Sequence, residues 1–481
     1  MGYLEGGFGA CPLAALGVGL LRRLLQKCAK ALLYPFALPL TGIPGCLWRE
    51  FCNSLLRGSL WLRLACGETR PFGAALRIPH ARRARPILLS FRISGLMLLS
   101  GIPGWGKPDQ GSDSLACVRF LRREVRQLCR FEGRGYAGRG YQKAARYLYR
   151  RFQKMGYKTR IDTFQHTVRY VKRAYIRPHG SRPWRVGIDF WPSPMSPLVK
   201  GHLMVDTIPS PGKLWLIPDT MPLREAIRQA LSNRVQGILR PVRKVNASYA
   251  DELLPFLFIE TIWRPAAGTQ LEVCLQIEQE QVQNYNVIAE KPGRQDSFWI
   301  LGAHYDHLGR VGRSVFWGAN DNASGVAFLL LLARRLSRDT LPYGVMWVAF
   351  GGEEAGLLGS YYFVGRHGQR LKRLKGMLNF DLMGYGEKGI AVVGAADQEG
   401  FWGRVVQHRP LTLAEVPHLL RPNAPNSDHY PFREKGYPAL FFYLEGGPGY
   451  YHDPLDRPET LSWYRAYDMV RWMEALLRSA K

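Results

Sequence analysis

Cysteine is scarce beyond the first quarter of the chain. Seven of the eight cysteines precede residue 130, and the 351 residues that follow contain only Cys274. This distribution excludes a disulfide framework and a Cys-x-x-Cys metal site from the larger part of the protein. Cys117 and Cys129 both fall on a predicted amphipathic helix over 114–130, and twelve helical residues span roughly 18 Å. Since a disulfide joins Cα atoms no more than roughly 7 Å apart, these two cysteines cannot pair with each other.

Acidic residues are also few: 38 Asp and Glu stand against 66 Lys and Arg, a net charge of +28. Residues 1–130 alone carry 19 basic and 6 acidic residues. An excess of this size favours contact with anionic surfaces, whether nucleic acid, phospholipid or cell wall. The sequence contains no zinc-finger spacing, no RNA-binding sheet signature and no run that interleaves aromatic and basic residues. We therefore predict no nucleic-acid partner and a weak association with an anionic cell envelope.

The N-terminal region lacks an uninterrupted apolar helix. Residues 31–48 carry no charge, but their three prolines break helical hydrogen bonding, so we predict no membrane span there. Three arginines between residues 82 and 85 precede an apolar run over 87–102, and small residues suited to cleavage follow. This order is typical of a secretory signal, although it stands unusually far from Met1.

This late signal-like segment, near 82–106, shapes the expected location of the protein. We expect residues 1–106 to be a disordered leader, with the true translation start near residues 80–97. An ordinary N-terminal domain is the alternative. With a secretory signal the mature protein would be extracytoplasmic, either periplasmic or secreted.

The rest of the chain is long enough for more than one domain. Residues 107–175 predict N-terminal helices and first strands, and 281–481 alternate strands with helices. Between them, 176–280 consist of Pro-rich segments and short strands, which indicate an insert; a continuation of the same domain is the alternative. The predicted fold class is α/β, with a mixed, mostly parallel central sheet flanked by helices and a smaller inserted α+β or β-rich domain.

Polar residues gather where predicted strands end, which is where open α/β sheets bind ligands. The strand over 298–302 leads to His304 and Asp306, whose spacing of two puts them on one side of an extended chain. The Asp306 carboxylate can thus support a metal-binding imidazole. Asp321 is the only carboxylate in a loop that opens a helix, and a plain helix cap is the alternative for that loop.

A second group of acids follows two further strands. Glu353 and Glu354 come directly after the buried strand 343–350, where adjacent carboxylates repel unless a cation or proton compensates them. Asp381 ends another apolar strand, and His452 lies in a turn-rich loop. Two histidines and three carboxylates without thiolate suit zinc, with manganese and cobalt as alternatives, and a bridging carboxylate suits two metals.

These motifs resemble the co-catalytic zinc exopeptidases, in the aminopeptidase-type branch of the zinc peptidase superfamily. The resemblance covers roughly residues 114–170 and 280–481. It rests on motifs that stand in the family's order: Ala303-His304-Tyr305-Asp306, Gly318 to Gly325, Gly352-Glu353-Glu354, Asn379-Phe380-Asp381, Ser427-Asp428-His429 and Tyr451-His452-Asp453-Pro454. The stretch 131–136 is also similar to bacterial members with a protease-associated (PA-like) insert, which implies that residues 176–280 form such an insert.

The resemblance implies two Zn²⁺ ions, with a hydroxide that bridges them. The implied metal ligands are His304, Asp321, Glu354, Asp381 and His452, with Asp321 as the bridge and the other pairings left open. Catalytic roles are implied for Glu353, the general base, and for Asp306. A cis peptide bond is implied between Asp321 and Asn322. Some relatives have a tyrosine just before the Ser-Asp-His motif, and this chain does not. The predicted substrate-binding residues are Asp428, His429, Tyr430 and Tyr443.

The implied function is a zinc aminopeptidase that hydrolyses the N-terminal bond of a peptide or protein. A carboxypeptidase and a single-zinc glutaminyl cyclase on the same fold are alternatives, and the presence of both His304 and Asp321 argues against the cyclase. A metal-free binding ectodomain is the alternative from another class. The sequence leaves the oligomeric state and the preferred N-terminal residue open.

Overall fold

The computed structural model describes residues 110–136, 138–248, 254–416 and 418–480. The described residues belong to one compact unit. The predicted leader, its signal-like segment and the apolar stretch 31–48 all lie outside the described residues. Among the described helices, none has the length and apolar character needed to cross a membrane.

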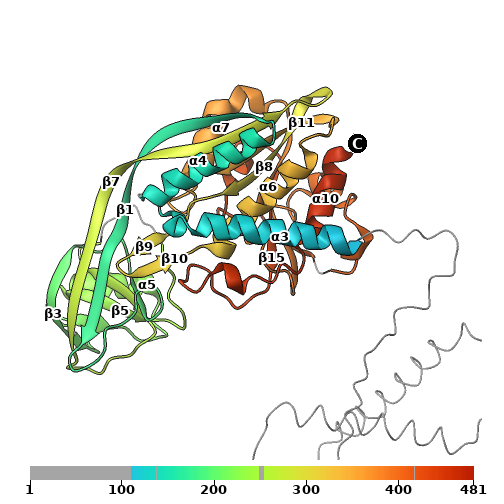
Figure 1. Ribbon diagram of the computed structural model, residues 1–481. Coiled ribbons are helices and arrows are strands. Elements are labelled where there is room, and N and C mark those ends of the chain that lie inside the picture. Colours follow the sequence, from blue (N-terminus) through green and yellow to red (C-terminus); the bar gives the residue numbers. More distant parts are fainter. Residues whose placement is uncertain (1–109, 137, 249–253, 417, 481) are drawn as a thin grey trace, which may run out of the picture. The chain divides into compact units, whose positions relative to one another are not determined.

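A mixed sheet with helices on both faces forms the centre of this unit (Figure 1). Its strands run in the order β14-β13-β15-β12-β8-β11-β7, with β1 beside β7. Pairing is parallel from β15 through β12 and β8 to β11, and antiparallel at β7. The predicted fold class is therefore confirmed. The strands are β1 (Lys158–Pro178), β7 (Gln270–Lys291), β8 (Gln295–His304), β11 (Tyr343–Phe350), β12 (Leu374–Phe380), β13 (Gly389–Val393), β14 (His418–Arg421) and β15 (Ala439–Glu445).

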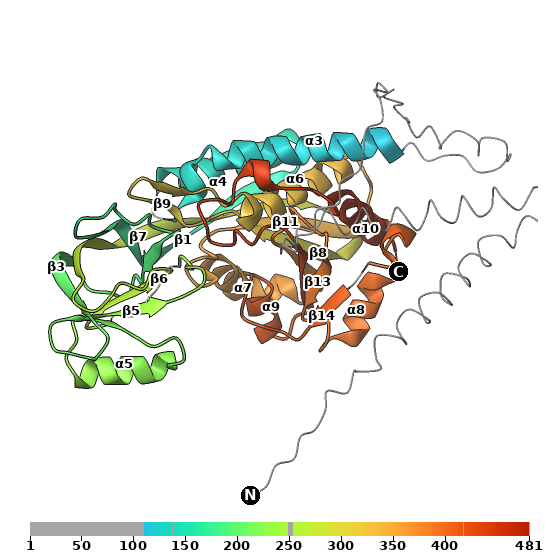
Figure 2. The ribbon, with the colours of Figure 1, turned by 90° about the horizontal axis from the view of Figure 1, so that it is seen from below.

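Helices cover both faces because each central strand is apolar on both sides. Along β11, Val345 and Trp347 join one hydrophobic cluster, whereas Met346 and Val348 join another on the opposite face. The first cluster packs against α3, α4, α6 and α10, and the second against α7 and α9 (Figure 2). The helices are α3 (Gln110–Cys129), α4 (Arg139–Lys154), α6 (Gly325–Leu336), α7 (Leu358–Leu371), α8 (Glu399–Val406), α9 (Tyr430–Glu434) and α10 (Ala466–Arg478).

Short elements connect these layers. Four helical turns are η1 (Glu132–Arg134), η2 (Ala319–Ser324), η3 (Leu411–Leu413) and η4 (Pro458–Thr460). A separate hairpin consists of β9 (Gly309–Val311) and β10 (Ser314–Phe316). The peptide bond between Asp321 and Asn322 in η2 is cis, as the family resemblance implies. Cys117 and Cys129 both lie on α3 as buried free thiols.

The strands β1 and β7 continue beyond the central sheet into a second region. Figure 1 shows them running side by side as far as the smaller strands. This region has its own hydrophobic clusters, and α5 packs within one of them. Its elements are β2 (Phe190–Pro192), β3 (Val199–Asp206), β4 (Leu214–Leu216), α5 (Leu223–Ser232), β5 (Gly237–Pro241) and β6 (Leu257–Thr261). The predicted insert boundaries at 176 and 280 fall within β1 and β7 rather than between elements.

Candidate metal centre

The carboxyl ends of three adjacent parallel strands bring the predicted residues to one edge of the sheet. His304 is the last residue of β8, and it pairs in register with Phe350 at the end of β11. Asp381 directly follows β12, which pairs with the other side of β8. Parallel register therefore places side chains that are up to 77 positions apart in the sequence beside one another.

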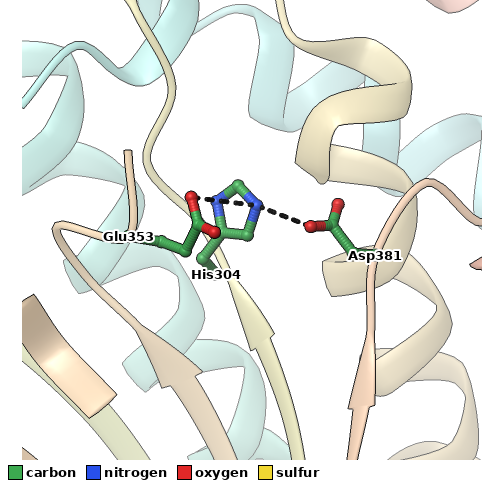
Figure 3. Close-up of side chains that lie close together, drawn as sticks. All are labelled: His304, Glu353 and Asp381. Carbon is green, nitrogen blue, oxygen red and sulfur yellow. Dashed lines mark hydrogen bonds and ion pairs between the residues drawn. The ribbon is translucent and has the colours of Figure 1, made fainter. Parts of the chain in front are cut away.

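The first group at this edge consists of His304, Glu353 and Asp381. His304 Nε2 lies 3.2 Å from Asp381 Oδ2 and 3.8 Å from Glu353 Oε2. Figure 3 shows both carboxylates directed at the imidazole ring from different sides. One ligand atom from each residue lies within 4.8 Å of the others, a spacing that one metal ion can span.

A second group consists of His307, Asp321 and Glu354, again with ligand atoms within 4.8 Å of one another. His307 Nδ1 lies 2.6 Å from Glu354 Oε1 and 4.0 Å from Asp321 Oδ1. His307 is not among the residues predicted from the sequence. Its position directly after Asp306, in the same loop, could have pointed to it. Neither the alternation of strand residues nor the family motif includes it.

Asp321 touches both groups. Its Oδ1 lies 3.4 Å from His304 Nε2, and its Oδ2 lies 3.2 Å from His452 Nε2. His452 Nε2 is also 3.1 Å from Glu354 Oε2. All five predicted metal ligands thus converge, and Asp321 has one carboxylate oxygen toward each group.

Asp306 acts on the backbone of the glutamate loop. Its two oxygens accept hydrogen bonds from the N–H groups of Glu353, at 3.2 Å, and Glu354, at 3.1 Å. The Asp306 carboxylate is 3.8 Å from His304 Nδ1, whereas the Asp306 backbone carbonyl is closer, at 3.3 Å. Asp306 therefore holds the loop that carries both glutamates, and its carbonyl faces the imidazole that its carboxylate was predicted to support.

Asn286 of β7 holds the same loop from the other side. Its Oδ1 accepts a hydrogen bond from the N–H of Gly351, at 3.1 Å. Its Nδ2 donates to the carbonyl of Gly359, at 2.8 Å. The glutamates lie between these two glycines, so a single buried amide fixes both ends of their loop.

Two further buried side chains fix the loop that carries Asp321. The Asp456 carboxylate accepts hydrogen bonds from the N–H groups of Asn320, at 2.9 Å, and Asp321, at 3.0 Å. The fully buried Arg134 donates to the carbonyls of Trp317, at 3.0 Å, and Gly318, at 2.7 Å. These contacts join residues more than 130 positions apart, which local sequence patterns do not report.

The second region of the fold contacts the His452 loop. His452 Nδ1 is 2.6 Å from the carbonyl of Ala247, so this nitrogen carries the proton and donates. Nε2 is thereby left free to face Asp321 and Glu354 as a ligand. Lys244 Nζ donates to the carbonyls of Gly449 and Tyr451, each at 2.5 Å.

The part of the chain that forms this edge of the sheet matches a known protein family in sequence. The family model described as peptidase family M28 matches residues 286–477, which include all five predicted metal ligands. We name this matched stretch the M28 segment. The aligned relatives include an aminopeptidase of Pseudomonas aeruginosa (strain UCBPP-PA14), 34% identical over 126 residues, and leucine aminopeptidase 1 of Trichophyton rubrum, 38% identical over 111 residues. These alignments cover 25% and 21% of this chain but only 22% and 29% of the relatives.

Solved structures share the fold of the M28 segment and of much of the remaining chain. BSAP, a zinc aminopeptidase from Bacillus subtilis, matches with a TM-score of 0.60 and 20% identity over 74% of this chain and 93% of its own. An aminopeptidase from Aneurinibacillus sp. strain AM-1 matches with a TM-score of 0.57 and 20% identity over 75% and 93%. At this identity the likeness establishes the common architecture.

The electrostatics of the M28 site call for a cation. Among the described residues, no Lys or Arg forms an ion pair with Asp321, Glu353, Glu354 or Asp381; their charged partners are histidines. Burial disfavours the charged form of His304, but Glu353 and Asp381 outweigh it and raise the pKa of His304 well above its ordinary value. Asp381 Oδ1 is buried without a hydrogen-bond partner. Without metal, protons on the imidazoles balance the carboxylates, and a divalent cation can replace them.

The two adjacent glutamates of the M28 site differ in proton affinity. Burial raises the pKa of Glu353 well above its ordinary value, with repulsion from Glu354 adding to the rise and His304 opposing it. Burial also acts on Glu354, but attraction to His452 and His307 outweighs it and lowers its pKa to about 2. Glu354 is therefore suited to hold a cation, and Glu353 is suited to carry a proton.

Of the four predicted substrate-binding residues, two are fully buried and one lines a cavity. Asp428 and His429 are completely buried, and burial raises the pKa of Asp428 to about 7 and lowers that of His429 to about 3. Tyr443 lines a cavity of about 110 Å³ that reaches Asp321. Tyr430, which begins α9, is not among the residues that line this cavity.

Proposed function

We propose that this protein is a zinc-dependent aminopeptidase that removes the N-terminal residue of peptides or proteins. The observation that carries the proposal is the shared position of Asp321, which has one oxygen toward each of two buried ligand groups. The aminopeptidase names of the aligned relatives support it. A zinc aminopeptidase among the structures with this fold supports the choice of metal.

The residues at the site fit two zinc ions. His304 and Asp381 would hold one ion and Glu354 and His452 the other, with Asp321 between them. Nitrogen and carboxylate oxygen are ligands that zinc accepts, and the uncompensated carboxylates provide the charge. Zinc supplies Lewis acidity, which lowers the pKa of water and polarises the scissile carbonyl group.

Glu353 moves the proton in this proposal. Its carboxylate lies beside the first ligand group, and its high proton affinity lets it take a proton from the attacking water and return it to the leaving amine. Asp306 and Asn286 hold the loop in place during this transfer, since they bind its backbone on both sides. The chain thereby supplies a fixed base next to the point of attack.

The cavity beside Asp321 favours an amine over a carboxylate as the bound terminus. Asp321, Glu445 and Asp456 line it together with tyrosines, and none of its lining residues is Lys or Arg, although Glu445 also pairs with Arg421 at 2.6 Å. A carboxypeptidase requires a cationic group to hold the terminal carboxylate, which Arg does best. Acidic walls instead suit a protonated α-amine.

The test compares a free and a blocked N-terminus in the purified full chain. Leucyl-anilide should be hydrolysed, the matching N-acetylated peptide should not, and activity should follow zinc content through chelation and reloading. Cleavage of the blocked peptide alone would reject aminopeptidase action. A protein that folds but takes up no zinc would instead revive the binding ectodomain.

We further propose that the second region of the fold is the PA-like insert and that the mature protein is extracytoplasmic. The insert proposal rests on the motif at 131–136 and on the separate hydrophobic clusters of this region. The proposal that the mature protein is extracytoplasmic rests on the signal-like segment alone. N-terminal sequencing of purified protein tests it, because a mature terminus at Met1 or Gly2 contradicts cleavage.

A further inference from the structure

The outer side of α3 carries a stripe of cations. Arg119, Arg122, Arg123 and Arg126 are exposed and recur at helical spacing, while the opposite side of α3 is buried against α6. Of these four, only Arg123 has an acidic partner, Glu124. Glu124 is almost fully buried, and it also pairs with Arg151 of α4 at 2.7 Å. The stripe therefore stays strongly positive.

A second stripe of the same sign lies on α4. Its exposed basic residues are Arg139, Lys143, Arg146, Arg150 and Lys154. The helix contains no acidic residue. Since Glu124 of α3 also accepts a hydrogen bond from Tyr147, the two helices lie side by side, and Figure 2 shows them as the outer layer on one side of the sheet. Their outward stripes form one surface, which we name the α3–α4 basic face.

Several exposed cations elsewhere on the described surface are paired with acids. Arg177 pairs with Glu272 at 2.7 Å, Arg421 with Glu445 at 2.6 Å, and Arg478 with Asp339 at 2.8 Å. The two acids within α3 and α4 are both engaged on the inner side, Glu124 as described and Asp113 with Arg335 at 2.7 Å. Clustered cations without acids between them repel one another, which destabilises the fold. An anionic partner would remove this repulsion.

We propose that the α3–α4 basic face binds the surface of an anionic phospholipid bilayer. Nine exposed cations on one side of two adjacent helices match the lipid phosphates, and arginine can contact a phosphate with two parallel hydrogen bonds. No exposed position of either stripe holds an aromatic residue on which a nucleic-acid base could stack.

The sequence next to α3 favours a bilayer over other polyanions. The apolar run 87–102 contains a single charged residue, Arg92. Only seven residues separate this run from Gln110, the first residue of α3, and eight peptide units span at most roughly 28 Å. In a precursor that still carries the apolar run, Gln110 therefore stays within that chain length of any lipid surface that the run enters. Basic groups beside a membrane-inserted segment are attracted to anionic lipid.

The test is co-sedimentation of the full chain with vesicles of phosphatidylcholine, with and without roughly one-third phosphatidylglycerol. The anionic vesicles should bind the protein at least about tenfold more strongly, and added salt should remove the difference. The variant R122E/R126E/R146E/R150E should bind anionic vesicles about 100-fold more weakly. The neutral variant R122Q/R126Q/R146Q/R150Q repeats the test with a smaller loss, should the charge-reversed chain fail to fold.

A matched control separates the face from the net charge. The variant K200E/R224E/K372E/K435E changes the net charge equally at exposed positions away from α3 and α4, and its binding should stay within about threefold of the parent. Equal losses in both variants would overturn the proposal. Equal binding to neutral and anionic vesicles would do so too, and so would retention of a DNA duplex in place of vesicles.

Discussion

The strand β7 runs through two regions that bury it differently. From residue 286 to 289 it lies in the central sheet and is buried at every position, whereas from 271 to 276 its buried and partly exposed residues alternate. Between these stretches Gln279 and Glu280 are exposed. The difference shows that helices cover both faces of the central sheet, while the second region covers mainly one face of the ribbon.

The exposed stretch also separates the hydrophobic clusters. Val282 of β7 and Val168 of β1 belong to the cluster of the M28 core, while Ile277 and Val171 pack with the second region. The two regions nevertheless meet again at Ala247 and His452. The second region thus has a hydrophobic cluster of its own, which also takes in Leu308, Val311 and Phe316 of the M28 segment, and it touches the metal centre as well.

The largest effect is expected from Glu353→Gln, which changes the chemistry and leaves both cores intact. Loss of the proton acceptor should lower kcat by about 100- to 10,000-fold. Zinc content and the thermal unfolding midpoint should stay near those of the parent, because Glu353 is not among the proposed ligands. Steady-state kinetics with metal analysis checks this, and retained activity would show that another group is the base.

Removing one buried tryptophan from each region tests whether the two cores unfold together. Trp347 and Trp191 are 0% and 4% exposed, so each change to alanine should cost about 3–5 kcal/mol in its own core. Trp347→Ala should destabilise the whole M28 fold. Trp191→Ala should speed hydrogen exchange in β3 to β6 first, while amides of β8, β11 and β12 stay protected. Equal acceleration in both sheets would mean one cooperative core.

Lys244→Met tests the contact between the second region and the metal centre. Loss of its hydrogen bonds to the carbonyls of Gly449 and Tyr451 should loosen the His452 loop and weaken zinc retention by about tenfold. Competition with a chelator measures this directly. Lys244→Arg should restore part of the retention. The control Lys200→Met, at an exposed lysine of the same region, should have no effect.

The smallest effect concerns Asp113 and its ion pair with Arg335 on the side of the M28 core. The hydrogen bond from Arg335, with Tyr467 adding to it and burial opposing it, holds the pKa of Asp113 below its usual value. Because the folded-state pKa is depressed, the pair stabilises the fold above about pH 4 and loses this contribution as the pH falls through the folded-state pKa. Asp113→Asn should therefore cost less than about 1 kcal/mol at pH 7, since the pair is partly exposed. Urea unfolding at pH 7 and pH 3 should show the parent and the variant converging at the lower pH.

The sequence predicted the residues that follow strands and, apart from Asp306, missed those that support them. His304, Glu353 and Asp381 were found because each comes at or just after the end of an apolar run, and parallel pairing brings such ends together. The strand over 343–350 has the observed bounds, since its apolar residues are continuous. Residues that depend on one local pattern were therefore predictable.

The supporting residues depend on distant contacts. Arg134 and Asp456 act on a loop more than 130 residues away, and the Ala247 contact uses only a backbone carbonyl, which has no sequence signature. The insert boundaries were drawn where the composition changes, but β1 and β7 continue through them, because a strand needs no change of composition to pass from one core to another. Fold topology, rather than local pattern, determines these features.

The length of β7 gives the molecule a mechanical property. One end of this strand pairs with β3. Near its other end, the Asn286 side chain hydrogen-bonds to both ends of the loop that carries Glu353, the proposed base. Strands β1 and β7 form one continuous two-stranded ribbon that joins the second region to the central sheet. A displacement of the outer end of this ribbon would therefore be transmitted along β7 to the side-chain amide of Asn286. That amide holds the loop of Glu353, the proposed base.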